Sequence, residues 1–219
     1  MIPKVFHQYW TDPRDSGRPV PSDITHNRES WTNLYPEFAH SLWTDTTLPE
    51  LLSDVGGVDV WSHVKICRLP AMRADIVRLG LVFLMGGFWV DLKNVARERI
   101  PNELLDIAAP LFVEHPGLQV RTIPKGFVSN SFFGAPAGST ILFDALHRAC
   151  TNVALRIAGD IFETTGPSLL NAALRENREA VRIIPHPGFW GVLVERTTAS
   201  YNEGEMHWSE RQQKESLYW

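Results

Sequence analysis

Cysteine and clustered charge are both scarce in this sequence. Only two cysteines occur among 219 residues, Cys67 and Cys150, and they lie far apart without the spacing of metal ligands. Each has apolar neighbours, so both are expected to be buried thiols in a reducing, intracellular setting. No run of lysines or arginines is present, and a formal net charge of -4 with a pI near 6.1 argues against nucleic acid as a partner.

Long hydrophobic segments are missing as well. The longest apolar run, from Leu79 to Val90, is interrupted by Gly86 and Gly87 and is shorter than the roughly 20 residues that cross a bilayer. The first residues lack the basic region and apolar run of a targeting segment. We therefore expect a cytoplasmic protein without a transmembrane segment, either free or peripheral to a membrane.

Several catalytic motifs are also absent. The sequence has no Gly-x-Ser-x-Gly, no Walker phosphate loop and no Gly-x-Gly-x-x-Gly after a strand, which argues against the enzymes built on those loops. Glycoside hydrolysis by two carboxylates stays open, because Asp45, Asp75 and Asp91 follow predicted strands or line the same crevice. No spacing selects a pair among them.

The chain does contain a large apolar and aromatic fraction. With 44% hydrophobic residues, eight tryptophans and eleven phenylalanines, it can form a full core, and aromatic faces suit bases and sugar rings. No internal repeat, low-complexity tract or linker is visible. Residues 1–219 are therefore expected to form a single domain.

Short apolar runs alternate with stretches of helical periodicity. Strands are predicted at residues 5–10, 38–43, 88–91, 110–114, 127–133 and 181–184. Helices are predicted at 22–34 and 139–149, with Ser22 and Ser139 as N-caps, and at 47–54, 59–67, 70–85 and from Pro167 onward. The tail from Tyr201 is expected to be a loop. The β-α-β-α order of the first half favours a largely parallel, doubly wound α/β sheet.

The predicted helix 70–85 is apolar on nearly every side and is therefore expected to be buried. Its three charges, Arg73, Asp75 and Arg78, then require partners, because a buried charge is costly when it has none. Asp75 and Arg78 are three residues apart and can face each other. They form either an internal ion pair or part of a site for a polar ligand.

A carboxylate follows the next predicted strand. Gly86 and Gly87 end the helix, Phe88-Trp89-Val90 forms a short apolar strand, and Asp91 stands at its end. Ligands of α/β proteins bind in the crevice beyond the carboxyl ends of the strands. Asp91 is therefore expected at a ligand site and not in the core.

Together these segments resemble the glycosyltransferases with the sugar-binding Asp-x-Asp motif, family 32, and more distantly the bacterial toxin glucosyltransferases. The resemblance rests on Ile2-Pro3-Lys4-Val5-Phe6-His7-Gln8-Tyr9-Trp10, Leu42-Trp43-Thr44-Asp45, Arg73-x-Asp75-x-x-Arg78 and Gly86-Gly87-Phe88-Trp89-Val90-Asp91-Leu92. Weaker echoes are Thr165-Gly166-Pro167 and His207-Trp208. The order and spacing are specific over residues 2–94 and loose beyond them.

This resemblance implies a GT-A fold, a single Rossmann-like mixed, mainly parallel sheet flanked by helices. Residues 1–94 would be the nucleotide-sugar-binding half, and 95–219 the acceptor-side half with a C-terminal closing loop. The implied activity is hexosyltransferase-like: transfer of a sugar from a nucleotide-sugar to a glycan or glycoconjugate, with retention of configuration, in polysaccharide biosynthesis. The alternative is a transferase-like module that binds a nucleotide-sugar without turnover.

The resemblance also implies roles for individual residues. Trp10 would stack on the base, with His7 and Gln8 as supports. Donor-binding residues would be His7, Gln8, Trp10, Arg73, Asp75, Arg78, Gly87, Asp91, Lys93 and Trp208. Of these, Asp91, Asp75 and Arg73 would be catalytic, with Arg78 holding Asp75 in place. His207 and Trp208 would close over the donor and exclude water.

Lys93 departs from the family pattern, because it stands where the second aspartate of the motif ligates a divalent cation. Three interpretations follow. Lys93 replaces the metal and pairs with the donor's diphosphate, so that transfer is metal-independent. Alternatively, Asp91, His207 and Asn94 hold Mn²⁺ or Mg²⁺ while Lys93 turns toward solvent. In the third interpretation the site binds a sugar or nucleotide without transferring it.

Overall fold

The computed structural model describes residues 1–12, 19–117, 126–177, 179–200 and 207–219. Its centre is a six-stranded sheet with the order β2-β1-β3-β6-β5-β7. The strands are β1 (Val5–Trp10), β2 (Ala39–Thr44), β3 (Gly87–Val90), β5 (Leu111–Glu114), β6 (Val128–Ala135) and β7 (Arg182–Ile184). These match the predicted strands to within two residues at each end.

The sheet is mixed and mainly parallel, as expected. β1 pairs in parallel with β2 and with β3, and β5 pairs in parallel with β7. β6 is the exception, because it runs antiparallel to both of its neighbours, β3 and β5. The start of β6 therefore lies at the same edge of the sheet as the carboxyl ends of β1, β3 and β5.

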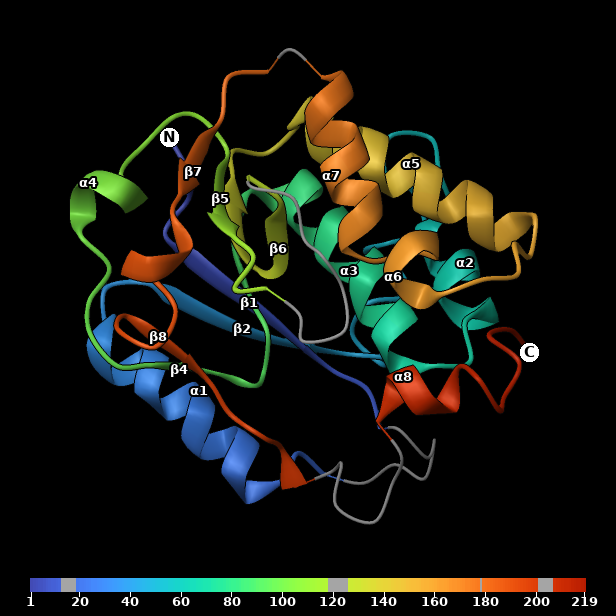
Figure 1. The fold of residues 1–219 in the computed structure, drawn as a ribbon, viewed down its shortest axis with the longest axis horizontal. Helices are drawn as coiled ribbons and strands as arrows, with labels where there is room; N and C mark the ends of the chain where they lie inside the picture. The colour runs from blue at the N-terminus through green and yellow to red at the C-terminus, as the bar shows by residue number, and fades with distance from the viewer. Residues whose placement is uncertain (13–18, 118–125, 178, 201–206) are drawn as a thin grey trace.

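Helices cover both faces of the sheet (Figure 1). One face carries α2 (Val60–Ile66), α3 (Pro70–Met85), α5 (Thr140–Ala154), α6 (Ile161–Thr164) and α7 (Pro167–Glu176). The other carries α1 (Ser22–Leu34) beside a two-stranded ribbon of β4 (Asn94–Ala96) and β8 (Val194–Arg196), with the short α4 (Asn102–Leu105) nearby. The last helix, α8 (Trp208–Arg211), lies toward the carboxyl end of β1 (Figure 1).

Successive side chains of β3 point to opposite faces of the sheet and so belong to two separate hydrophobic clusters. Trp89 packs with the cluster that includes α2, α3 and α5, whereas Phe88 and Val90 pack with the aromatic cluster around Trp31 of α1. All three β3 side chains are almost fully buried. A strand buried on both faces reads as a continuous apolar run, which is what its sequence shows.

Two glycines, the last residue before β3 and its first residue, are required by the backbone conformation and the close neighbours at this point. Gly86 ends α3 with a φ of +65°, and Gly87 follows with a φ of +97°. A Cβ added at Gly87 would lie 2.4 Å from Cγ1 of Val5. Gly87 thus allows β3 to lie close against β1, which aims the carboxyl end of β3 at the site.

Three local predictions were wrong. Residues 47–54 form turns and bends instead of a helix, and at their start Thr47 Oγ1 accepts from Thr44 N–H at 2.9 Å, which closes a turn over residues 44–47. α1 begins at Ser22 with Pro21 as its N-cap, so Ser22 is not the cap. Ser139 is the N-cap of α5, as predicted, although its side chain makes no capping hydrogen bond. In the tail, residues 201–206 lie outside the described residues, but α8 replaces the expected loop after them.

None of the described helices is both long and apolar enough to cross a membrane.

Candidate functional site

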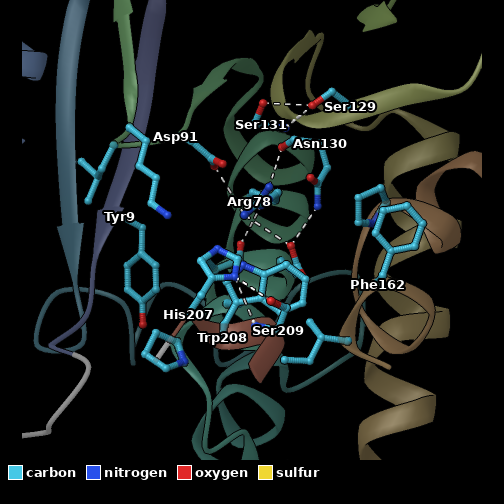
Figure 2. A pocket seen from close by; sticks show the side chains of 18 of the residues that line it. Tyr9, Arg78, Asp91, Ser129, Asn130, Ser131, Phe162, His207, Trp208 and Ser209 are labelled. Carbon is cyan, nitrogen blue, oxygen red and sulfur yellow. Dashed lines mark hydrogen bonds and ion pairs between the residues drawn. The ribbon is translucent and has the colours of Figure 1, made fainter. Parts of the chain in front are cut away.

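A cavity of about 540 Å³ lies at the carboxyl edge of the sheet. Residues from the ends of β1, β3 and β5, from the start of β6 and from α3, α6 and α8 line it. Figure 2 shows Asp91, Arg78 and Asn130 on one side of this cavity and His207, Trp208 and Ser209 approaching from another. The position agrees with the rule that α/β proteins bind ligands beyond their strand ends.

Two carboxylates share one guanidinium in the cavity. Nη2 of Arg78 lies 3.3 Å from Oδ1 of Asp75 and 3.4 Å from Oδ1 of Asp91. The same guanidinium donates to the Asn130 carbonyl at 2.6 Å and lies over the Trp89 ring at 5.2 Å. Asp75 and Arg78 therefore form the predicted ion pair, and both side chains line the cavity.

Asp75 is the more deeply buried of the two carboxylates. Its carboxylate accepts from Nδ2 of Asn130 at 2.8 Å and from the Thr165 hydroxyl at 3.1 Å. Burial raises the pKa of Asp75 to about 6, mainly through loss of solvation, and Asp91 adds to the rise while Arg78 opposes it. Asp91 is more open, and its Oδ1 already accepts from Nε1 of Trp89 at 2.7 Å.

Arg73 does not line the cavity. Its Nε donates to the Cys67 carbonyl at 2.9 Å, and its Nη1 lies 3.3 Å from Oγ1 of Thr11 and 3.5 Å from Oδ2 of Asp45. Asp45 also accepts from Thr11 at 2.7 Å and from the Tyr9 hydroxyl. Arg73 thus braces the end of β1, from which Tyr9 and Thr11 reach the cavity.

The β1 residues divide between structure and cavity. Trp10 lines the cavity, but His7, Gln8 and the β3 residue Gly87 do not. Nε2 of His7 lies 2.9 Å from the Gly86 carbonyl, and its Nδ1 accepts from Trp43. Because Nδ1 is an acceptor, Nε2 carries the proton and the ring is neutral; burial lowers its pKa.

Lys93 lines the cavity and is half-buried. Burial lowers the pKa of Lys93, Asp91 raises it and Arg196 lowers it further. The backbone here is held firmly, since Lys93 O accepts from Thr197 N–H at 2.8 Å. Beside it, Nδ2 of Asn94 donates to Ser131 O at 2.9 Å, while Oδ1 is buried with no partner in the described structure.

The α8 segment brings His207 and Trp208 to the cavity from the C-terminal end of the chain. His207 is the N-cap of α8 and its Nδ1 lies 2.8 Å from Oγ of Ser209. Gln212, one residue beyond α8, accepts from Ile161 N–H at 2.8 Å, which ties α8 to the start of α6. Burial, and then the nearby Lys93, lower the pKa of His207.

The described residues include no group of three or more His, Cys, Asp or Glu side chains placed to hold a metal ion. Of the expected ligands, Asp91 has one oxygen engaged by Trp89 and Arg78. The positive charge of Lys93 acts on both Asp91 and His207. This donor set fits a resident cation poorly, because a protonated lysine repels it.

Several cavity residues were not anticipated from the sequence. They are Thr11, His115, Ser129, Asn130, Ser131, Phe162 and Arg196. Most come from the second half of the chain, where the resemblance is loose. In that half, the sequence motif Thr165-Gly166-Pro167 was the one pointer to the site: the Thr165 hydroxyl donates to the Asp75 carboxylate.

Comparison with solved structures supports the fold. The structure titled PaToxG Glycosyltransferase superposes with a TM-score of 0.54 over 80% of this chain and 69% of that one, at 14% identity. This chain therefore has the GT-A type fold that was expected from its sequence. No family model matches the sequence.

Among curated proteins, the chain is similar to enzymes named for sugar transfer. Inositol phosphoceramide mannosyltransferase 3 of Schizosaccharomyces pombe is 28% identical over 148 residues, covering 66% of this chain and 36% of that protein. Mannosyl phosphorylinositol ceramide synthase SUR1 of Saccharomyces cerevisiae is 28% identical over 138 residues, covering 62% and 31%. The chain therefore spans about a third of the length of these relatives. Assignment to family 32 stays a prediction.

Proposed function

We propose that this chain is a glycosyltransferase that moves a hexosyl group from a nucleotide-sugar to a hydroxyl of a glycan or glycoconjugate. The observation that carries the proposal is the buried cluster of Asp75, Arg78 and Asp91 at the strand-end cavity. Curated relatives named as mannosyltransferases support the same class of reaction. Retention of configuration rests on the family resemblance alone and is tested by NMR of the product anomer.

The cluster suits recognition of a sugar. Sugar hydroxyls are both donors and acceptors, so they bind best to a rigid array of charged partners. Asp75 and Arg78 are locked by Asn130 and Thr165, which limits the entropy lost on binding. Asp91 keeps one carboxylate oxygen that Trp89 and Arg78 do not engage, and this oxygen is available to a donor hydroxyl.

Lys93 is proposed to supply the positive charge that a divalent cation supplies in related enzymes. Support comes from its half-buried position in the cavity and from the donor set, which fits a metal poorly. An ammonium group near the diphosphate stabilises charge that develops on the leaving group, and it does so best where water is excluded. His207 and Trp208 line the same cavity, and His207 lies near enough to Lys93 for their charges to interact, which supports a role for the pair in excluding water there.

The names of the relatives suggest the first substrates to test. One is named an inositol phosphoceramide mannosyltransferase and another a mannosyl phosphorylinositol ceramide synthase. A mannose nucleotide and an inositol-bearing acceptor are therefore the first pair to offer this chain. The remaining nucleotide-sugars form the second panel.

The decisive experiment measures sugar transfer and donor hydrolysis by mass spectrometry, with Mn²⁺, with Mg²⁺ and with chelator. We expect activity that survives chelator and falls at least about a hundredfold in Lys93→Ala, because an ion pair to a diphosphate contributes several kcal/mol in a dry site. Lys65→Ala, an exposed lysine on α2, is the matched control and should retain full activity.

Strict dependence on a divalent cation would overturn the role of Lys93 and leave sugar transfer intact. Nucleotide binding without hydrolysis or transfer under every condition would overturn the enzymatic proposal. The chain would then be the binding module that is the alternative to an active transferase.

A further inference from the structure

A second cation stands beside Lys93 in the cavity. Arg196 ends β8, and the β4–β8 pairing sets it opposite Asn94, the residue after Lys93. Thr197, the next residue, donates to the Lys93 carbonyl at 2.8 Å. Both cations therefore reach the cavity from one rigid ribbon, and their charges act on each other.

The arginine is held in place without a carboxylate. Its guanidinium lies over the Trp190 ring at 5.9 Å, and Nε1 of Trp190 donates to Glu114 O at 2.9 Å. The neighbouring acid, Glu195, is paired with Arg97 instead. Within the described part of the chain, the structure pairs Arg196 with no carboxylate, so its charge is available to a ligand.

The imidazole of His115 is a neutral hydrogen-bond donor close to Arg196. His115 follows β5, lines the same cavity and lies close enough to Arg196 for their charges to interact. Burial, then Arg196 and His186, lower the pKa of His115 to about 4, so the ring is neutral at pH 7. Gly117 N–H donates to Nδ1 of His115 at 3.1 Å, which leaves Nε2 as the N–H donor.

We infer that Arg196 and His115 form, beside Lys93, a corner of the cavity that binds a phosphate group. The inference rests on the proposed function and adds to it the residues that hold the anion. A planar guanidinium, an ammonium and an imidazole N–H together match the tetrahedral oxygens of a phosphate ester. The phosphate is either the diphosphate of the donor or a phosphate carried by the acceptor.

Calorimetric titration of the full chain tests this corner with three probes: inorganic pyrophosphate, GDP and UDP as nucleoside diphosphates, and inositol 1-phosphate. Arg196→Ala should weaken binding of at least one probe roughly tenfold, while Arg196→Lys keeps part of the affinity. Arg97→Ala is the matched control, because Arg97 follows β4 on the same ribbon, is paired with Glu195 and does not line the cavity. It should change affinity less than about twofold. Circular dichroism of each variant checks that the fold is intact.

The probes also separate the two sources of phosphate. A loss confined to pyrophosphate and the nucleoside diphosphates supports the corner and assigns it to the donor, and a loss confined to inositol 1-phosphate supports it and assigns it to the acceptor. Equal binding by wild type, Arg196→Ala and Arg97→Ala, or no binding of any probe by wild type, overturns the inference. Sugar transfer that continues in Arg196→Ala with unchanged probe affinities would overturn this corner while leaving the proposed function standing.

Discussion

The protonation of Asp75 should make the stability of this protein fall as the pH rises from about 4 to about 6. In the folded state burial raises the pKa of Asp75 from 3.8 to about 6. Between those values the folded protein keeps the proton that the unfolded chain has released. Stability therefore decreases as the pH rises through this window and is flat above it.

The size of the effect follows from the same two values. A pKa of about 6 in place of 3.8 corresponds to about 3 kcal/mol, at about 1.4 kcal/mol for each tenfold change. Asp75 is only 6% exposed, so solvent screening removes little of this amount. The opposing attraction of Arg78 is already part of the folded-state pKa of about 6.

The assay is urea unfolding of wild type and Asp75→Asn, followed by tryptophan fluorescence at pH 4, 5, 6 and 7.5. The amide cannot ionise, so the wild type should gain about 2.5 kcal/mol relative to Asp75→Asn between pH 7.5 and pH 4, most of the full effect. Asp106→Asn, at a half-exposed site paired with Lys4, controls for the general effect of losing a carboxylate. A wild-type-minus-variant difference that stays constant, or that moves the other way, would refute the reasoning.

Two further predictions concern the glycine pair and the thiols. Gly87→Ala should lower the free energy of unfolding by roughly 2–4 kcal/mol, because the new Cβ would lie 2.4 Å from Val5 in a left-handed backbone. Gly57 is the matched control, with a φ of +86° and nothing within 4 Å of an added Cβ, so Gly57→Ala should cost only about 1 kcal/mol. Thermal unfolding of both variants measures the two losses, and equal losses would contradict the steric argument. Cys67 and Cys150 are buried free thiols whose pKa values burial raises to about 12, so Ellman's reagent should modify them only after unfolding. Rapid labelling of the native protein would show that one of the two sites opens.

Helix α3 shows how much of the site could be predicted locally. Its apolar residues occupy nearly every side, so burial followed from composition, and the spacing of Asp75 and Arg78 predicted their ion pair. Gly86 and Gly87 marked the end of the helix, and Asp91 marked the end of the strand. The helix, its ion pair, the glycine stop and the aspartate at the strand end are all local features. Each depends on residues close by in the sequence, and such features can be predicted from a sequence pattern.

Strand direction was beyond the reach of the same patterns. Nothing in the β6 sequence Val-Ser-Asn-Ser-Phe-Phe-Gly-Ala marks its direction, yet β6 runs antiparallel between β3 and β5 in a mainly parallel sheet. That reversal brings Asn130 to Asp75 across 55 residues of sequence. The helix predicted at 47–54 was also wrong, because the segment begins with a turn in which the Thr47 hydroxyl bonds both the N–H and the carbonyl of Thr44.

By itself, the sequence determined the elements and the carboxylates of this protein: a buried helix with an internal ion pair, a glycine stop, and an aspartate at a strand end. Only the tertiary structure decided which charges face the cavity. Arg73, singled out by its motif, braces Asp45 and Thr11, while Arg196, which no motif marked, reaches the cavity beside Lys93. The reason is that a long charged side chain takes its direction from its partners. For Arg196 the register of β4 against β8 sets that direction, across about a hundred residues of chain.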